Sequence, residues 1–100
     1  MSTGFTLERS GEGRVRLAGR LGFDEAPAAF RRTGELLDGS AAELEVDAGA
    51  LREVDSATLA VLLSWAADAA RRGIRLRVSS APGGLRALAQ LCGAEALLGI

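Results

Sequence analysis

Four segments of the chain alternate hydrophobic and polar residues, which is the pattern of a β-strand that buries one face. They span residues 5–9, 14–21, 42–48 and 74–80. The turn-forming sequence SGEG separates the first two segments. These two are therefore predicted to pair as an antiparallel hairpin.

Hydrophobic residues at helical spacing fill the rest of the chain. The predicted helices span 23–39, 54–72 and 82–93, followed by a short helical turn within 94–100. Asp24 suits the N-cap of the first helix and Pro27 suits its first turn, whereas Gly34 weakens it. Glycines mark the predicted ends of the three helices: Gly39, Gly73 and Gly93.

The predicted order of elements, β-β-α-β-α-β-α, constrains the topology. Helix 54–72 connects strands 42–48 and 74–80, so these strands are predicted to be parallel. Both alternate charged and apolar residues, whereas parallel strands covered on both faces are apolar throughout. We therefore expect one two-layer α/β domain over residues 1–100. It would have a four-stranded mixed sheet, with helices on one face and charged residues on the other.

The central helix has two different faces when its residues are placed about 100° apart. Its predicted sheet-facing stripe consists of Leu59, Leu62, Leu63, Ala66 and Ala70. Its predicted outward face consists of Ala57, Val61, Asp68 and Arg72, with Thr58 and Trp65 on the flank. Val61 and Trp65 are then either ordinary exposed apolar residues, with Trp65 tucked under a loop, or part of a docking surface.

Asp55 and Ser56, at the start of this helix, also have two interpretations. Either side chain could cap the helix by accepting a hydrogen bond from a free N–H, worth about 0.5–2 kcal/mol. Alternatively, the Ser56 hydroxyl is a partner contact or a phosphorylation site, since a helix N-terminus favours an anion. A phosphate would add about −1.5 to −2 charge beside Asp55 and Glu53 and could expel a partner.

The composition excludes several kinds of chemistry. The chain has no histidine and no lysine, which rules out an imidazole base, histidine metal ligands and a Walker A lysine. Its single cysteine, Cys92, excludes an internal disulfide and is predicted to be a small buried residue of the third helix. A net charge of −1 argues against a nucleic-acid partner. We expect a protein that is not an enzyme and needs no metal or cofactor.

Two further expectations concern the surface and the location of the protein. Glu43, Glu45 and Asp47 are predicted to lie on a solvated sheet face opposite arginines, not to form an acid/base pair. The first ten residues lack a signal-peptide pattern, and no run of about 18 apolar residues could span a bilayer. The expected location is the cytoplasm.

The segment VDSATLAVLLSW, together with the order of elements, resembles the STAS domain. That family has an acid, a Ser or Thr, a small residue and a Gly-Leu pair at the start of its second helix. Thr58 replaces the glycine here and adds bulk and a hydroxyl next to Ser56. Within the family the chain is most similar to MlaB-like domains, also over AGRLGFDEAPAAF and RRGIRLRVSSAPGGLRALAQLCGAEALL.

This resemblance implies a cytoplasmic, non-enzymatic subunit of a phospholipid-transport ABC transporter that maintains outer-membrane lipid asymmetry. Its partner would be the MlaF-like ATPase subunit, with the permease in the same complex. It would lie at the inner membrane through that complex, without inserting into it. The expected contact surface consists of Phe30, Asp55, Ser56, Ala57, Thr58, Val61 and Trp65.

Two alternatives stay open. The family also contains anti-sigma-factor antagonists, which would bind a kinase-type anti-sigma factor and be phosphorylated at Ser56. Phe30 also has a structural interpretation as a core residue. Its spacing puts it at the edge of a predicted buried stripe formed by Ala26, Ala29, Thr33 and Leu37.

Overall fold

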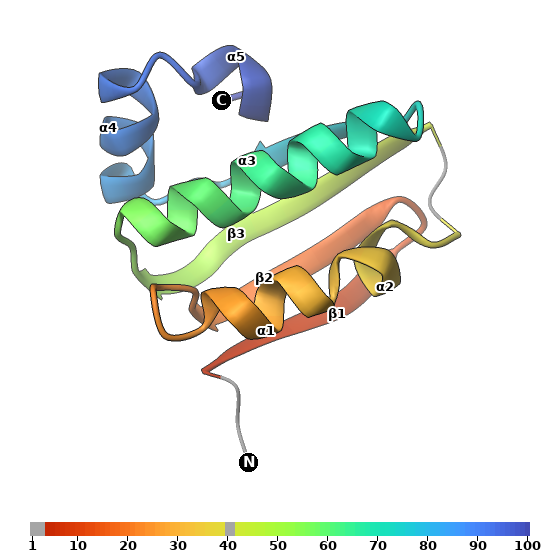
Figure 1. The fold of residues 1–100 in the computed structure, drawn as a ribbon, viewed down its shortest axis with the longest axis horizontal. Helices are drawn as coiled ribbons and strands as arrows, with labels where there is room; N and C mark the ends of the chain where they lie inside the picture. Colours follow the sequence, from red (N-terminus) through yellow and green to blue (C-terminus); the bar gives the residue numbers. More distant parts are fainter. Residues whose placement is uncertain (1–3, 40–41) are drawn as a thin grey trace.

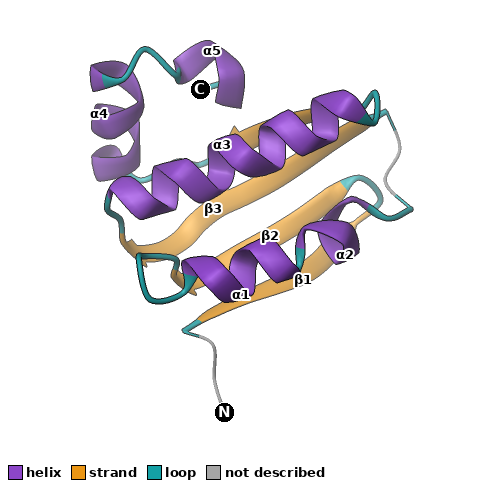
Figure 2. Ribbon diagram, viewed as in Figure 1, coloured by secondary structure: helices purple, strands orange, loops and turns teal. Residues whose placement is uncertain are grey.

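A four-stranded mixed sheet with helices packed on one face forms the protein, as a computed structural model describes it for residues 4–39 and 42–100 (Figures 1 and 2). The strands, adjacent in this order, are β1 (Phe5–Gly11), β2 (Arg14–Arg20), β3 (Glu43–Glu53) and β4 (Arg75–Ser79). β1 and β2 are antiparallel, whereas β2 and β3, and β3 and β4, are parallel. The predicted hairpin, the parallel pair and the two-layer architecture are confirmed.

The helices are α1 (Ala26–Arg31), α2 (Thr33–Leu37), α3 (Ser56–Arg71), α4 (Gly83–Leu91) and α5 (Glu95–Leu98). α3 is the longest of them and lies across the sheet between α1 and α2 on one side and α4 and α5 on the other (Figure 1). α5 also contacts β4. The predicted third helix and the short final helical turn are confirmed by α4 and α5.

The predicted first helix is divided into α1 and α2. Arg32, at the junction, has φ −96° and ψ 7°, outside the usual α-helical range. The Thr33 hydroxyl donates a 2.9 Å hydrogen bond to the Phe30 carbonyl oxygen, a side-chain bond of the kind that bends helices. At the start of α1, Glu25 occupies the N-cap position that the sequence assigned to Asp24.

The hydrophobic core lies between the sheet and the helices. Leu17 of β2 and Val46 of β3 have no exposed surface, and neither does Leu62 of α3 or Leu85 of α4. The alternation along the strands explains this burial, because it points one row of apolar side chains at the helices. Leu59, in the first turn of α3, belongs to the same core, which anchors the start of this helix.

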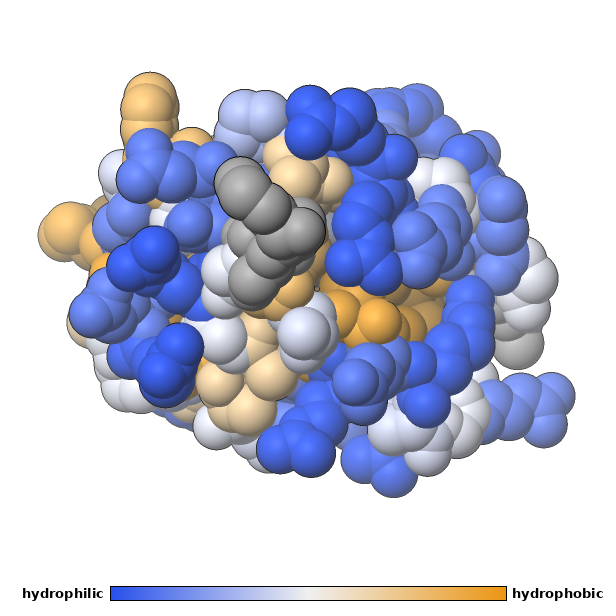
Figure 3. Space-filling view, turned by 90° about the horizontal axis from the view of Figure 1, so that it is seen from below, coloured by the Kyte–Doolittle hydropathy of each residue, from blue (hydrophilic) through white to orange (hydrophobic). Residues whose placement is uncertain are grey.

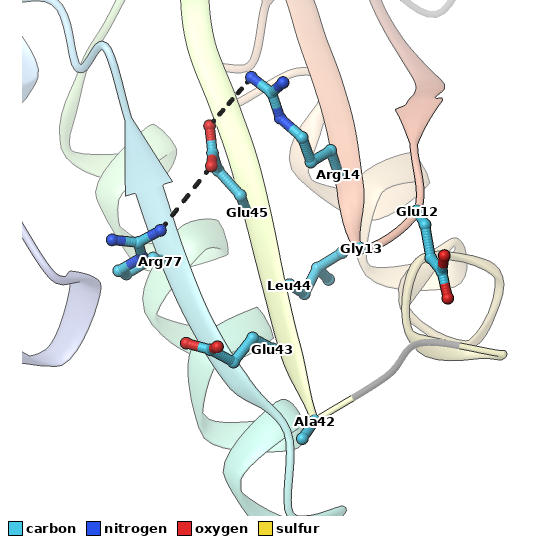
Figure 4. Close-up of a pocket in the computed structure, with 8 residues that line it drawn as sticks. All are labelled: Glu12, Gly13, Arg14, Ala42, Glu43, Leu44, Glu45 and Arg77. Carbon is cyan, nitrogen blue, oxygen red and sulfur yellow. Dashed lines mark hydrogen bonds and ion pairs between the residues drawn. The ribbon is translucent and has the colours of Figure 1, made fainter.

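The opposite sheet face is charged, as predicted. The Glu45 carboxylate lies between the guanidinium groups of Arg14 and Arg77, with N–O distances of 3.3 and 3.7 Å (Figure 4). It also accepts a 2.8 Å hydrogen bond from the Ser79 hydroxyl. This bond first, and the two arginines after it, hold the pKa of Glu45 below its ordinary value. Glu45 thus faces arginines, as expected, although Glu45 and Asp47 are half-buried and, of the three acids, Glu43 alone is fully exposed.

The prediction for Cys92 is wrong. Leu85 and Ala89 are buried on the inner side of α4, and helical spacing would place Cys92 beside them. However, α4 ends at Leu91, and Cys92 is the exposed C-cap residue. After this turn the chain buries Ala94 instead, and the Ala94 N–H donates to the Ala89 carbonyl oxygen at 2.8 Å.

The surface seen from below is largely hydrophilic. Hydrophobic side chains are visible between the charged ones and protrude at the left-hand end of this view (Figure 3). Among residues 4–39 and 42–100, none of the helices combines the length and the apolar character needed to cross a bilayer.

Candidate functional site

Asp55 and Thr58 cap the start of α3 reciprocally. Oδ1 of Asp55 accepts a hydrogen bond from the Thr58 backbone N–H at 3.0 Å. In return, the Thr58 hydroxyl oxygen accepts one from the Asp55 backbone N–H at 3.1 Å. This capping box satisfies two backbone donors at the point where a helix leaves its first N–H groups unpaired. The interpretation of Asp55 as an N-cap is confirmed.

Ser56, the first residue of α3, has an exposed side chain. Because Asp55 and Thr58 perform the capping, the Ser56 hydroxyl is not required for it. Ala57, the next residue, is half-buried and adds little bulk beside Ser56. The helix entry therefore presents a hydroxyl on a rigid backbone, accessible to another protein.

Val61, Trp65 and Thr58 do not belong to this exposed surface. The sequence placed Val61 on the outward face and the other two on the flank, but all three are 0% exposed. The expectation of an exposed apolar patch along α3 is therefore wrong. Trp65 is covered, as the simpler interpretation had it, but by helix α1 and not by a loop. The hydroxyl of Thr58 is inside the cap, not at the surface beside Ser56.

The physical reason is that α3 is covered on more than one side. α1 packs against α3, and the Trp65 indole N–H donates a 3.4 Å hydrogen bond to the Ala29 carbonyl oxygen. Helical spacing alone placed the buried stripe of α3 on the wrong side. In the structure Ala70 is exposed, and Leu63 and Ala66 are only half-buried. The buried residues of α3 are Thr58, Leu59, Val61, Leu62, Trp65 and Ala69.

Phe30 lies at the surface, on α1. Its side chain is 45% exposed, whereas its neighbour Ala29 is completely buried. This removes the core alternative for Phe30. Of the residues predicted to form one surface, the structure thus leaves Phe30, Asp55, Ser56 and Ala57 at least partly accessible.

The loop between β2 and α1 is held against the start of α3. Oε1 of the buried Glu25 accepts a 2.9 Å hydrogen bond from the Gly22 N–H, and its Oε2 lies 3.6 Å from the Arg20 guanidinium. A Cβ on Gly22 would lie 2.9 Å from Oδ2 of Asp55, too close for any larger residue without a shift. Gly22 therefore permits the close contact between this loop and the N-cap of α3.

Sequence reasoning missed Gly22 and Glu25, and also the exposed Phe23 between them. The preference of N-caps for Asp over Glu pointed to Asp24, whereas Glu25 occupies the position without a side-chain cap bond and its carboxylate accepts from the Gly22 N–H instead. The contact between Gly22 and Asp55 joins positions far apart in the chain, and no periodicity reports it. The one signal available in the sequence was Gly22, which directly follows the predicted strand 14–21 and precedes the aromatic Phe23.

The arrangement is suited to binding another protein. The Oδ1 atom of Asp55 is engaged in capping, and no hydrogen bond between Asp55 and the Ser56 hydroxyl is among the bonds of the described residues. Among the residues that the structure describes, no group of three or more Asp, Glu or Cys side chains could hold a metal ion. The site consists of an exposed hydroxyl, a small neighbour and the turn at Gly22 that packs against Asp55.

Comparison with family models matches residues 5–99 to the family described as "Mlab, STAS domain". This range includes the β1–α5 elements described above. A comparison with curated proteins finds no match. The mixed sheet, the order of its elements and the match over almost the whole sequence agree, and the chain belongs to the MlaB-type STAS domain family.

Proposed function

We propose that the protein is a non-enzymatic regulatory or assembly subunit that binds the ATPase subunit of a phospholipid-trafficking, Mla-type ABC transporter. Its family membership supports this role. The complex would include the permease, lie at the cytoplasmic side of the inner membrane and maintain the lipid asymmetry of the outer membrane.

The accessible Ser56 on the rigidly capped start of α3 carries the proposal. Capping by Asp55 and Thr58 fixes this backbone, so a partner that binds here meets a preformed surface and loses little entropy in ordering it. The effect on the ATPase would be indirect. Binding would favour the competent conformation of the ATPase only to the extent that the domain binds this conformation more tightly than the other one.

Replacing Ser56 with glutamate tests the contact. We expect Ser56→Glu to weaken binding to the purified ATPase subunit at least tenfold, about 1.4 kcal/mol, because it places bulk and charge in a desolvated interface. A glutamate in the first helical turn suits the helix dipole, so folding should be preserved. Affinity is measured by isothermal titration calorimetry, and folding by thermal unfolding.

The matched control is Ser10→Glu, which adds the same charge to an exposed serine of β1. It should bind like the unmodified protein. Equal affinities for the Ser56→Glu and Ser10→Glu proteins would remove Ser56 from the interface.

The exposed hydroxyl at a helix N-terminus also favours a second candidate, an anti-sigma-factor antagonist phosphorylated at Ser56. In that case a kinase-type anti-sigma factor, and not the ATPase, would be retained in a pull-down. Mass spectrometry after incubation with that kinase would find phosphate on Ser56. Retention of the ATPase without phosphorylation would exclude this second candidate.

A further inference from the structure

We infer that Phe23 is an aromatic anchor of the partner-binding surface, and that it fits an apolar pocket with basic side chains at its rim on the ATPase subunit. This rests on the proposed function. It adds a contact residue beyond those that the sequence indicated and defines the chemistry of the surface that the partner must present.

The exposure of Phe23 is the first observation. Its side chain is 80% exposed, more than that of Phe30 on the following helix at 45%, whereas Leu21 and Trp65 are completely buried. Folding leaves the apolar surface of this ring in water, so its burial by a partner would still be favourable. Exposed aromatic residues of this kind are common anchors of protein interfaces.

The second observation is that Phe23 stands on a closed turn. The Glu25 and Ala26 N–H groups each donate a 3.0 Å hydrogen bond to the Gly22 carbonyl oxygen. The Gly22 N–H is in turn bonded to the Glu25 carboxylate at 2.9 Å. The backbone on both sides of Phe23 is therefore held in place, and a partner need not order a flexible loop to bind the ring.

The third observation is position. Gly22, next to Phe23, packs against the Asp55 carboxylate, so the turn is continuous with the start of α3. Figure 1 shows the loop between β2 and α1 beside the loop between β3 and α3, at the left-hand end of the molecule. A partner that contacts Ser56 would therefore find Phe23 on the adjacent turn.

Charge indicates the chemistry of the partner. Arg20 lies 3.6 Å from the Glu25 carboxylate and 3.8 Å from that of Glu53, and it compensates these two acids within the protein. The exposed Asp24 and Asp55 have no arginine ion-pair partner among residues 4–39 and 42–100. The Asp55 carboxylate is already compensated by the backbone N–H that it caps. Asp24, next to Phe23 in the chain, is therefore the acid that is complementary to a basic rim around an apolar pocket.

The first experiment measures the affinity of variants for the purified ATPase subunit. Phe23→Ala should weaken binding at least about tenfold while leaving the thermal unfolding midpoint unchanged, because the removed side chain is solvent-exposed. Leu91→Ala is the matched control, because it truncates an 84% exposed apolar residue on α4. Asp24→Arg should also weaken binding and reduce its dependence on salt.

The second experiment reports burial directly. In a Phe23→Trp variant, the new indole should shift its fluorescence emission to shorter wavelength when the ATPase subunit is added. Trp65 is the natural tryptophan of the chain and is fully buried, so the unmodified protein provides the baseline. An unchanged emission spectrum in the bound complex would show that the ring stays in water and would overturn the inference.

The failures are distinguishable. If the unmodified protein does not bind the ATPase subunit, the proposed function is wrong and the anchor is wrong with it. If the protein binds and Ser56→Glu weakens the complex, but Phe23→Ala binds as tightly as Leu91→Ala, the proposed function stands and the anchor is wrong.

Discussion

Trp65 and Phe30 lie on packed helices but in different environments. Trp65 of α3 is completely buried and donates a hydrogen bond to the backbone of α1, whereas Phe30 of α1 is 45% exposed. The sequence assigned both residues to the expected contact surface and left open a core position for Phe30 and a covered position for Trp65. Their burial, not their type, now separates a structural role from a proposed binding role.

We expect Trp65→Ala to lower the free energy of unfolding by about 3–5 kcal/mol, since it leaves a large cavity and removes the indole hydrogen bond to the Ala29 carbonyl oxygen. Phe30→Ala should cost much less stability, because nearly half of its side chain is already in water. Urea unfolding of the two variants checks this. Equal losses would return Phe30 to the core.

At the scale of the element, the start of α3 combines two roles in adjacent residues. Asp55 and Thr58 stabilise the helix, and Ser56 between them keeps an exposed side chain, which we propose as the partner contact. The sequence therefore located the start of this helix correctly, although it offered both Asp55 and Ser56 as possible N-caps.

This division of roles predicts different effects on stability. Asp55→Ala should lower the free energy of unfolding by about 0.5–2 kcal/mol, because the Thr58 N–H loses its acceptor. Ser56→Ala should change it by no more than about 0.5 kcal/mol. Chemical denaturation compares the two, and an equal or larger loss for Ser56→Ala would mean that Ser56 caps the helix.

At the scale of the whole molecule, the sheet separates two surfaces. One face is covered by the helices, and the other carries rows of opposite charges, among them the cluster of Arg14, Glu45 and Arg77. The proposed contact lies at the end of the sheet where α3 begins. The charged face is not part of that contact. The pH dependence of its ion pairs should therefore be the same with and without a bound partner.

Glu45 makes this pH dependence measurable. Its pKa is held below the ordinary value of 4.5, so its ionised form stabilises the fold above that pH. The contribution is lost as the pH falls through the lowered pKa. Ser79→Ala should raise the pKa of Glu45 towards 4.5, because the hydroxyl bond is the largest cause of the shift. Carboxyl NMR titration measures it, with Ser10→Ala as the control; an unchanged pKa would contradict this assignment.

The sequence by itself determined the strands, the approximate helices and the two-layer architecture. Alternation along strands reports directly which side chains share a face, and adjacent elements such as the β1–β2 hairpin need only local turn signals. The predicted charged row on β3 followed for the same reason. The single first helix was an error because a local bond of Thr33 interrupts it.

Only the tertiary structure decided which residues are available to a partner. The orientation of α3 depends on α1 as well as on the sheet, so Val61 and Trp65 became core residues in spite of their predicted face. The contact of Gly22 with Asp55 arises where two loops meet, and it places Phe23 beside the start of α3. Helical periodicity describes one helix in isolation, whereas burial depends on all the segments that pack around it.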